Sequence, residues 1–221
     1  NMVDFHKYFE PLYNDIVTGY HSITILITIN KLILTNDGVM GCIGKYPSFW
    51  VETINAHKSN VFINLGKIFD KDEKAQSIHF LKRWLIKNNS ELKEEKIKIR
   101  SGPRRNIIWD DYRKNIHIFS IEDFSSYKKK VSSLQKEYDL KIKDWRNKIY
   151  AHREHFENDE IKLENVKYDY IAQIYAGLHG LYNDAFNAFY NGFRFSLEPR
   201  KLSNEEEIIQ QTTEVLKNNL R

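Results

Sequence analysis

Residues 120–156 of the chain read SIEDFSSYKKKVSSLQKEYDLKIKDWRNKIYAHREHF. Apolar side chains recur here every three or four residues, the spacing of one face of an α-helix. This stripe, with one histidine in it, comprises Val131, Leu134, Tyr138, Ile142, Trp145, Ile149, His152 and Phe156. Ser120 is a helix-capping residue type, and Asp123 takes the place of the usual glutamate of a capping box. The stretch predicts one long amphipathic helix that runs to about Phe156.

Similar periodicity extends over most of the remaining chain. It predicts further helices at about residues 4–34, 48–69, 73–87, 164–193 and 203–218, with Asp72 as a cap, Gly19 as a disturbance in the first helix and Ser203 as the cap of the last. The glycine-rich residues 37–44 predict a connecting loop. The polar residues 88–106, interrupted by Ser101-Gly102-Pro103, predict a mobile loop or insertion.

The composition favours an all-α fold in a single domain. With 9 glycines and 4 prolines in 221 residues, the chain lacks the turn residues that an all-β fold needs. Hydrophobic residues make up 41%, which is enough for a core. The single cysteine, Cys42, excludes an internal disulfide framework and a cysteine zinc cage, and it is compatible with the cytoplasm. The most apolar run, Ile23 to Leu34, is too short to span a bilayer, so we expect a buried helix and no membrane partner.

The charge is unevenly distributed along the chain. Residues 87–148 hold 17 Lys and Arg against 10 Asp and Glu, whereas residues 154–221 hold 7 against 12. A basic middle suits an anionic ligand and an acidic end suits a partner, although uneven patterning of a solvated surface gives the same counts. The run Lys128-Lys129-Lys130 is either a solvated face or a patch that steers a polyanion.

Two residues near the end of the long helix are candidates for chemistry. Arg146 and His152 are six positions apart, which on a straight helix places them about 120° around and about 9 Å along the axis. They are not direct neighbours, yet both can flank one phosphodiester, and a cleft across a two-fold dimer would ease the geometry. The residues alone leave open that His152 packs in the core and that Arg146 complements the helix dipole.

A metal site is the weaker explanation of the same region. His152 and His155 are three apart, with Glu154 and Glu157 close by. A metal needs three convergent ligands, and the sequence has neither an HExxH motif nor a second cluster. We therefore expect no metal. Three isolated histidines are expected to be structural or at the surface: His57, His79 and His117.

The segment Asp144 to Glu154, DWRNKIYAHRE, resembles the signature of the HEPN superfamily, which is an Arg, four to six residues of which the first is usually polar, and a His. Its form Arg-Asn-Lys-x-x-Ala-His is especially similar to abortive-infection HEPN proteins of the AbiU type. The stretch from Trp50 to Asp72, with its Leu-x-x-Ile-Phe-Asp ending, is similar to that family's first core helix. The resemblance covers about residues 47–195.

This resemblance implies a HEPN-type bundle of long antiparallel helices over residues 2–221, acting as a cytoplasmic homodimer. It further implies a metal-independent endoribonuclease of antiviral defence, or a toxin, without a cofactor. Arg146 would hold the scissile phosphate, His152 would act as general base or acid, and Asn147 would orient one of them. The expected RNA contacts are Lys148, Tyr150, Arg153, Lys128, Lys129 and Lys130.

Two other readings of the resemblance stay open at this point. One is a non-catalytic HEPN module that binds RNA or a partner protein. The other is an antitoxin-like or scaffold subunit whose acidic end docks a partner. An antitoxin or another defence-system protein is accordingly a further candidate partner beside RNA. The presence of both Arg146 and His152 favours the nuclease.

Overall fold

The computed structural model describes residues 4–106, 109–146 and 168–218, and over these ranges the protein is helical, without a strand. The predicted all-α class is confirmed. The α-helices are α1 Phe5–Thr35, α2 Asp37–Lys45, α3 Pro47–Ile68, α4 Ile78–Lys87, α5 Glu94–Asn106, α6 Trp109–Tyr112, α7 Ile121–Lys141, α8 Lys143–Arg146, α9 Tyr168–Asn191 and α10 Glu205–Asn218. There are also two short 3₁₀ turns. The first, η1 Asn89–Leu92, connects α4 to α5, and the second, η2 Arg113–Asn115, follows α6.

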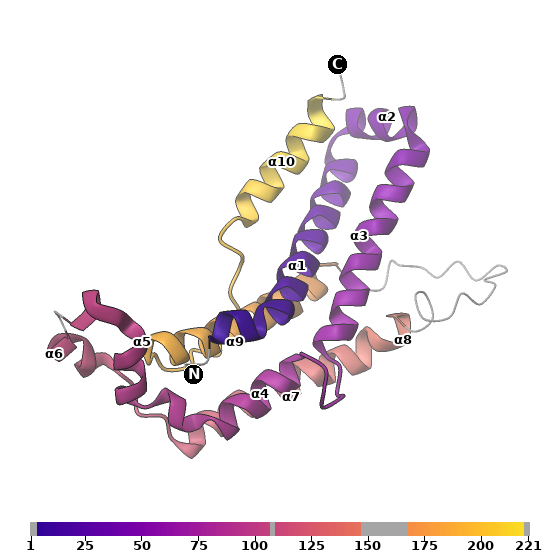
Figure 1. Cartoon of the computed structure of the whole chain (residues 1–221). Helices are drawn as coiled ribbons and strands as arrows, with labels where there is room; N and C mark the ends of the chain where they lie inside the picture. Colours follow the sequence, from indigo (N-terminus) through magenta and orange to yellow (C-terminus); the bar gives the residue numbers. More distant parts are fainter. Residues whose placement is uncertain (1–3, 107–108, 147–167, 219–221) are drawn as a thin grey trace.

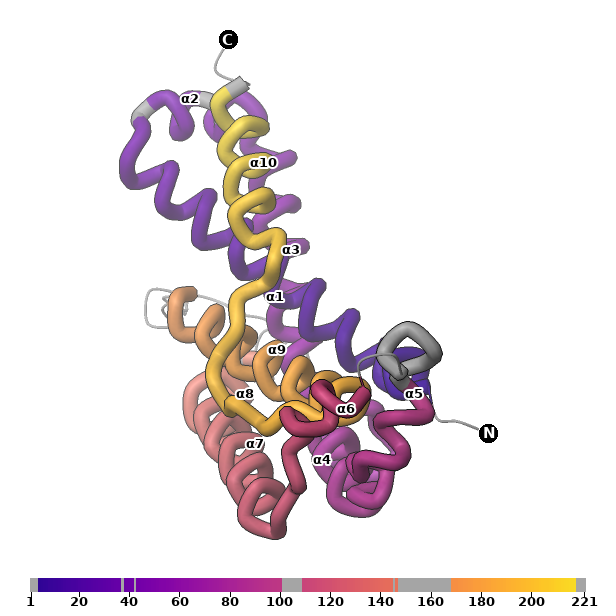
Figure 2. Tube along the Cα trace, turned by 90° about the vertical axis from the view of Figure 1, so that its left-hand side faces the viewer, coloured from indigo at the N-terminus to yellow at the C-terminus, as the bar shows by residue number. Residues whose placement is uncertain are grey.

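Helix α1 is the central element of the fold. It contacts α3, α9 and α10 along its length (Figures 1 and 2). The Tyr175 side chain of α9 crosses α1 at Gly19 and donates a hydrogen bond to the Val61 carbonyl of α3 at 2.7 Å. A Cβ at position 19 would collide with that ring, so the glycine permits the three helices to meet. The predicted disturbance at Gly19 is wrong, because α1 continues through it.

The helices form a body and an arm (Figures 1 and 2). The body contains α4 to α9 and the lower parts of α1 and α3. The arm consists of the upper parts of α1 and α3, joined at the tip by α2, with α10 alongside. The arm has a small core of its own, formed by Ile29, Val39, Trp50 and Leu216.

The predicted loop at residues 37–44 is wrong, because these residues form α2. The Asn36 side chain accepts a hydrogen bond from Gly38 N at 3.0 Å and starts the helix. Val39 is completely buried in the core of the arm. Burial of one face thus stabilises a helix in spite of its three glycines, since tertiary packing overrides weak local propensity.

The predicted loop at residues 88–106 is also wrong as to secondary structure. These residues form η1 and α5, which are held to the body by the buried Ile97 and by Arg100. The Arg100 side chain is 3% exposed, pairs with Glu91 at 3.0 Å and lies 3.8 Å over the Phe189 ring of α9. The preceding helix α4 begins at Ile78 with Ser77 as its cap, so Asp72 is not the cap that the sequence indicated.

The long helix predicted from Ser120 is confirmed in its first part. Ser120 and Asp123 form a reciprocal capping box, with hydrogen bonds of 3.3 and 2.8 Å. The stripe of apolar residues is buried as expected through Ile142. Contrary to the prediction of an unbroken helix to Phe156, α7 ends at Lys141, and the chain bends at Ile142 into the single turn α8.

The later helices begin and end close to the predicted positions. Helix α9 covers Tyr168–Asn191, and α10 begins at Glu205, two residues after the expected start. Among the described helices, α1 has the length and apolar composition that a membrane span requires. Half of its most apolar window is buried inside the protein, as in the core helix of a helical domain.

Candidate functional site

Arg146 is the last residue of the turn α8, which follows the non-helical Ile142 and contacts α3. The last hydrogen bond of this turn runs from Arg146 N to the Ile142 carbonyl at 2.9 Å. The Arg146 guanidinium lies on the α3 backbone at Gly66. Its Cζ and one Nη atom are 2.7 and 2.9 Å from the point that a Cβ at position 66 would occupy. The partly exposed side chain therefore takes the space left by the glycine.

A second contact orients the Arg146 side chain. Its guanidinium lies close enough to the hydroxyl of Tyr138 on α7 to act on the pKa of that group. Burial raises the pKa of the Tyr138 phenol, and the nearby positive charge of Arg146 opposes that rise. The Tyr138 ring stacks on Phe69, with ring centroids 4.7 Å apart and planes 20° apart. We call Gly66, Phe69 and Tyr138 the Arg146 seat.

The ion pairs of the described residues leave the charge of Arg146 unused. Among the described residues, no carboxylate forms an ion pair with it. The nearby Asp139 is paired instead with Lys71 at 3.2 Å and with Lys143 at 3.9 Å. Partial burial acts to raise the pKa of Asp139, but hydrogen bonds from Gln135 and Lys71 lower it overall. This carboxylate thus stays ionised and engaged with the two lysines.

The three isolated histidines have structural contacts, as predicted. His79 is buried and its Nε2 lies 2.6 Å from the Gln135 side-chain oxygen, which ties α4 to α7. His117 Nε2 is 2.8 Å from the Asp123 carboxylate, beside the capping box of α7. His57 Nδ1 is 3.3 Å from the Ser22 hydroxyl, between α3 and α1. His79 and His57 therefore join helices, and His117 contacts the first turn of α7.

Most of the predicted site lies outside the described residues. Asn147, Lys148, Tyr150, His152 and Arg153 all fall in the range 147–167. The distance between Arg146 and His152 and the environment of His152 stay predictions from the sequence. The alternative metal ligands His152, Glu154, His155 and Glu157 fall there too. Within the described residues, no group of three His, Cys, Asp or Glu side chains is placed to hold a metal ion.

The lysine run 128–130 is not brought to the Arg146 seat. Lys128 and Lys129 are exposed, and Lys130 is half-buried, on α7. They precede the C-terminal end of α7 by roughly 17 to 20 Å along its axis at 1.5 Å per residue, and Arg146 follows in the separate turn α8. Lys82 on α4 lies near Lys128, and burial and then this like charge lower the pKa of Lys82. The run is thus part of a basic surface that is separate from the seat.

Sequence reasoning did not single out Gly66, Phe69 or Tyr138 as site residues. Gly66 is a lone glycine within a helical pattern, and such a residue has a packing or functional reason more often than not. That signal was available. The contact that explains it joins α3 to α8, and no local pattern reports such a contact.

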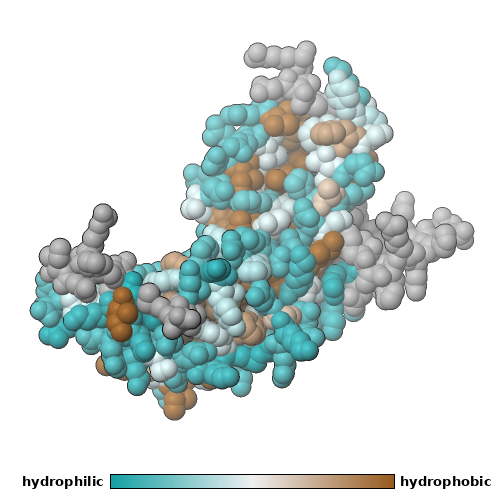
Figure 3. All heavy atoms as spheres, viewed as in Figure 1, coloured by the Kyte–Doolittle hydropathy of each residue, from teal (hydrophilic) through white to brown (hydrophobic). Residues whose placement is uncertain are grey.

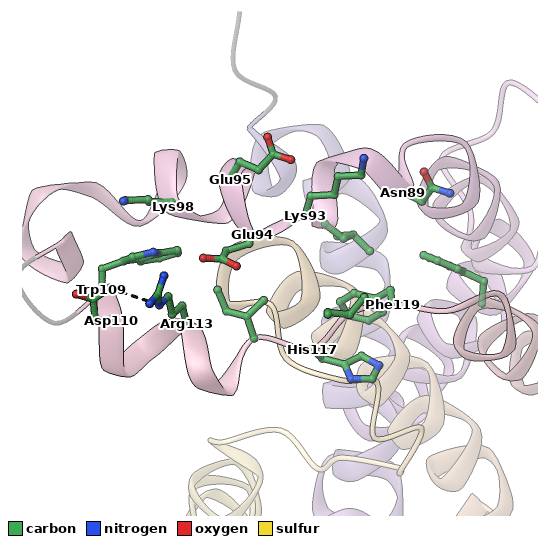
Figure 4. A pocket seen from close by; sticks show the side chains of 14 residues that line it. Asn89, Lys93, Glu94, Glu95, Lys98, Trp109, Asp110, Arg113, His117 and Phe119 are labelled. Atoms are coloured by element: carbon green, nitrogen blue, oxygen red, sulfur yellow. Dashed lines mark ion pairs between the residues drawn. The ribbon is translucent and has the colours of Figure 1, made fainter.

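A separate hollow of about 760 Å³ lies at the other end of the body, between α5 and the segment that follows α6 (Figure 4). Its lining includes Trp109, and the Lys98 ammonium lies 5.5 Å from the centroid of the Trp109 ring. Its charged lining residues are Lys93, Lys98, Arg113, Glu94, Glu95 and Asp110. Because positive and negative side chains are equally numerous, the hollow favours neither sign of ligand.

The comparison with protein families agrees with the fold and the motif. The model of the HEPN_AbiU2 family, described as AbiU2, matches residues 4–211. The match includes α1, α2 and the first half of α10, beyond the range 47–195 of the sequence resemblance. No curated protein and no solved structure matches the chain.

Proposed function

Because the chain belongs to the HEPN_AbiU2 family, we propose that it is a cytoplasmic, metal-independent endoribonuclease that acts in abortive infection or as a toxin. The observation that supports this is the state of Arg146. Its guanidinium is oriented by Tyr138, is partly exposed and has no carboxylate partner among the described residues. Such a group binds a phosphate and stabilises the negative charge that develops on it during cleavage.

The proposed reaction needs no metal-activated water, because RNA supplies its own nucleophile. The ribose 2′-oxygen attacks the adjacent phosphorus while His152, as general base, accepts the hydroxyl proton. The bond from phosphorus to the 5′-oxygen of the next nucleotide breaks, and that oxygen takes up a proton. The products are a 2′,3′-cyclic phosphate and a 5′-hydroxyl end. Arg146 holds the phosphate and Asn147 orients one of the two side chains.

The test is incubation of the protein with total RNA and with tRNA, in EDTA, beside His152→Ala. We expect cleavage by the wild type, a 2′,3′-cyclic phosphate end, and a loss of about 10² or more in the variant, the usual size of general acid–base catalysis. DNA should resist because it has no 2′-hydroxyl. Full cleavage by His152→Ala, or cleavage that EDTA abolishes, contradicts the mechanism. RNA binding without cleavage supports the alternative of a non-catalytic HEPN module.

We further propose that the active unit is a homodimer formed through the outer face of α3. Phe49, Ala56 and Ile63 are spaced by seven residues and point the same way from this helix. Phe49 is 62% and Ile63 is 44% exposed, and Ala56 is also exposed. These three apolar side chains on one exposed line of the helix are the surface that the proposed dimer covers.

The occupant that suits this stripe is a second copy of α3. In an antiparallel pair that crosses at Ala56, Phe49 packs against the partner's Ile63, and the small Ala56 permits close approach at the crossing. An apolar hollow of about 240 Å³ between α3 and α10 adjoins Phe49 and extends the surface. Figure 3 shows hydrophobic side chains on the arm where α10 lies alongside α1. Gly66 lies one turn beyond Ile63, so the Arg146 seat borders the proposed interface.

A further inference from the structure

We infer that Gly66 is a positioning residue for Arg146, and that Tyr138 completes this role by fixing the direction of the guanidinium. The inference rests on the proposed function where it concerns catalysis. The seating itself is independent of that function and is measured separately below.

No backbone requirement explains a glycine at position 66. The residue lies inside α3, two positions before the helix ends, where glycine is the poorest helix former except proline. Its backbone angles are ordinary, since Gly192 is the glycine with positive φ among the described residues. No turn begins there either. What remains is the space beside its Cα, and the atoms that fill this space belong to the Arg146 guanidinium.

The Arg146 seat reduces the conformational freedom that a catalytic arginine would otherwise lose when it binds substrate. The side chain is long and flexible, and it loses rotamer freedom when it binds a phosphate. Contact with the surface of α3 at Gly66 and the interaction with the Tyr138 hydroxyl restrict it before the substrate arrives. The stacking of Tyr138 on Phe69 in turn fixes the hydroxyl. Because a guanidinium has five N–H groups, the interaction with Tyr138 leaves others for a phosphate.

A methyl group at position 66 should displace the guanidinium without harming the helix. The obstructing atoms are the far end of a flexible side chain, which moves aside easily, whereas alanine improves the helix. Gly66→Ala should therefore raise the denaturant midpoint of unfolding or leave it unchanged. Its kcat/KM on RNA should fall roughly 10- to 100-fold, the usual effect of a displacement of about 1 Å in a reacting geometry. The loss should be mainly in kcat.

The control is Gly41→Ala in α2, where a Cβ meets no atom within 4 Å. It should raise the midpoint of unfolding and leave kcat/KM within twofold of wild type. Tyr138→Phe keeps the stacked ring but removes the hydroxyl, so it should lower kcat/KM in the same way as Gly66→Ala. In an Arg146→Ala background, neither Gly66→Ala nor Tyr138→Phe should lower activity further, because both act through that side chain.

A measurement without substrate separates the seat from the proposed function. The ring carbon signals of labelled tyrosine, followed by NMR through a pH titration, report the pKa of Tyr138, with Tyr138→Phe used for assignment. Gly66→Ala should raise this pKa by about as much as Arg146→Ala does, because both remove the positive charge from the hydroxyl. Gly41→Ala should leave it unchanged.

The outcomes judge the two proposals separately. If wild-type protein does not cleave RNA but Gly66→Ala shifts the Tyr138 pKa, the proposed nuclease fails and the seat stands. If Gly66→Ala leaves both the Tyr138 pKa and the activity at wild-type values, the inference is overturned. The inference is also overturned if Gly66→Ala lowers the activity of the Arg146→Ala variant by the same factor as it lowers the activity of the wild type.

Discussion

Arg146 of α8 and Gly66 of α3 share one space, because the guanidinium of the first lies where a side chain of the second would begin. The two residues are far apart in the sequence and meet where α8, which follows the end of α7 at Lys141, contacts α3. The orientation of the motif arginine therefore depends on the packing of α3 against α7 and α8. The following predictions use this relationship and the surfaces around it.

Arg146→Lys should reduce kcat/KM on RNA by about 10², although it keeps the positive charge. A lysine ammonium is a compact point charge. Unlike the planar guanidinium, it cannot contact Tyr138 and bind a phosphate through two parallel hydrogen bonds at the same time. Steady-state cleavage of a short labelled RNA measures the effect. Lys143→Ala is the matched control in the same turn, because Lys143 is exposed and contacts Asp139 only at 3.9 Å. Wild-type activity of Arg146→Lys would show that charge alone is needed.

Joint replacement of Lys128, Lys129 and Lys130 by alanine should weaken RNA binding at low salt and reduce its salt dependence. Each phosphate contact on single-stranded RNA contributes a slope of about −0.7 in log K against log salt, so three contacts contribute about −2. Fluorescence anisotropy at several salt concentrations measures both values. Because the lysines lie more than two turns before the end of α7 and Arg146 lies in the separate turn α8, kcat at saturating RNA should not change. An unaltered slope would mean that the run is only a solvated face.

Ala56→Glu should convert a dimer to a monomer at tens of micromolar protein. In the proposed antiparallel pair this position meets its own copy at the two-fold axis, where two carboxylates would be close together in an apolar contact. Light scattering coupled to size exclusion measures the mass. Val51→Glu is the control, because Val51 is 54% exposed on the same helix but points to another side. A wild-type monomer, or equal dissociation by both variants, would remove the α3 face from consideration.

The stability of the protein should fall as the pH drops below about 6.5, in part through His79. Burial lowers the pKa of His79, and the cations Lys82, Lys71 and Arg83 act in the same direction, whereas the Gln135 hydrogen bond opposes them. Below the ordinary histidine pKa of about 6.5 the unfolded chain binds a proton that the folded protein resists. Acidification through this range therefore favours unfolding.

His79→Asn should make the pH dependence between pH 5 and pH 7.5 shallower, as urea unfolding would show. His57 and His179, whose pKa values burial also lowers, should keep part of the slope. Unfolding at pH 8, where the imidazole is neutral in both states, gives the packing cost of the substitution alone. An identical slope for His79→Asn and the wild type would contradict this assignment.

The helical periodicity was sufficient to predict α1, α3, α7 and α9, because each buries one face at regular spacing. The Ser120 capping box could also be predicted from the sequence, because its two hydrogen bonds join residues only three positions apart. Helix α2 was missed because its glycines have low helix propensity and its stabilisation comes from burial of Val39 against α1, α3 and α10. Helix α5 was missed because Arg100, a charged residue, is its anchor to α9.

The sequence by itself determined the all-α class, the long helix from Ser120 and the family, because these depend on residue types at short, regular separations. It also identified Arg146 as the motif arginine. Only the tertiary structure decided where that side chain lies. The turn α8 contacts α3, Gly66 leaves room for the side chain and Tyr138 orients it. These contacts join three helices, and the steric exclusion and polar interaction that create them exist only once the helices are packed.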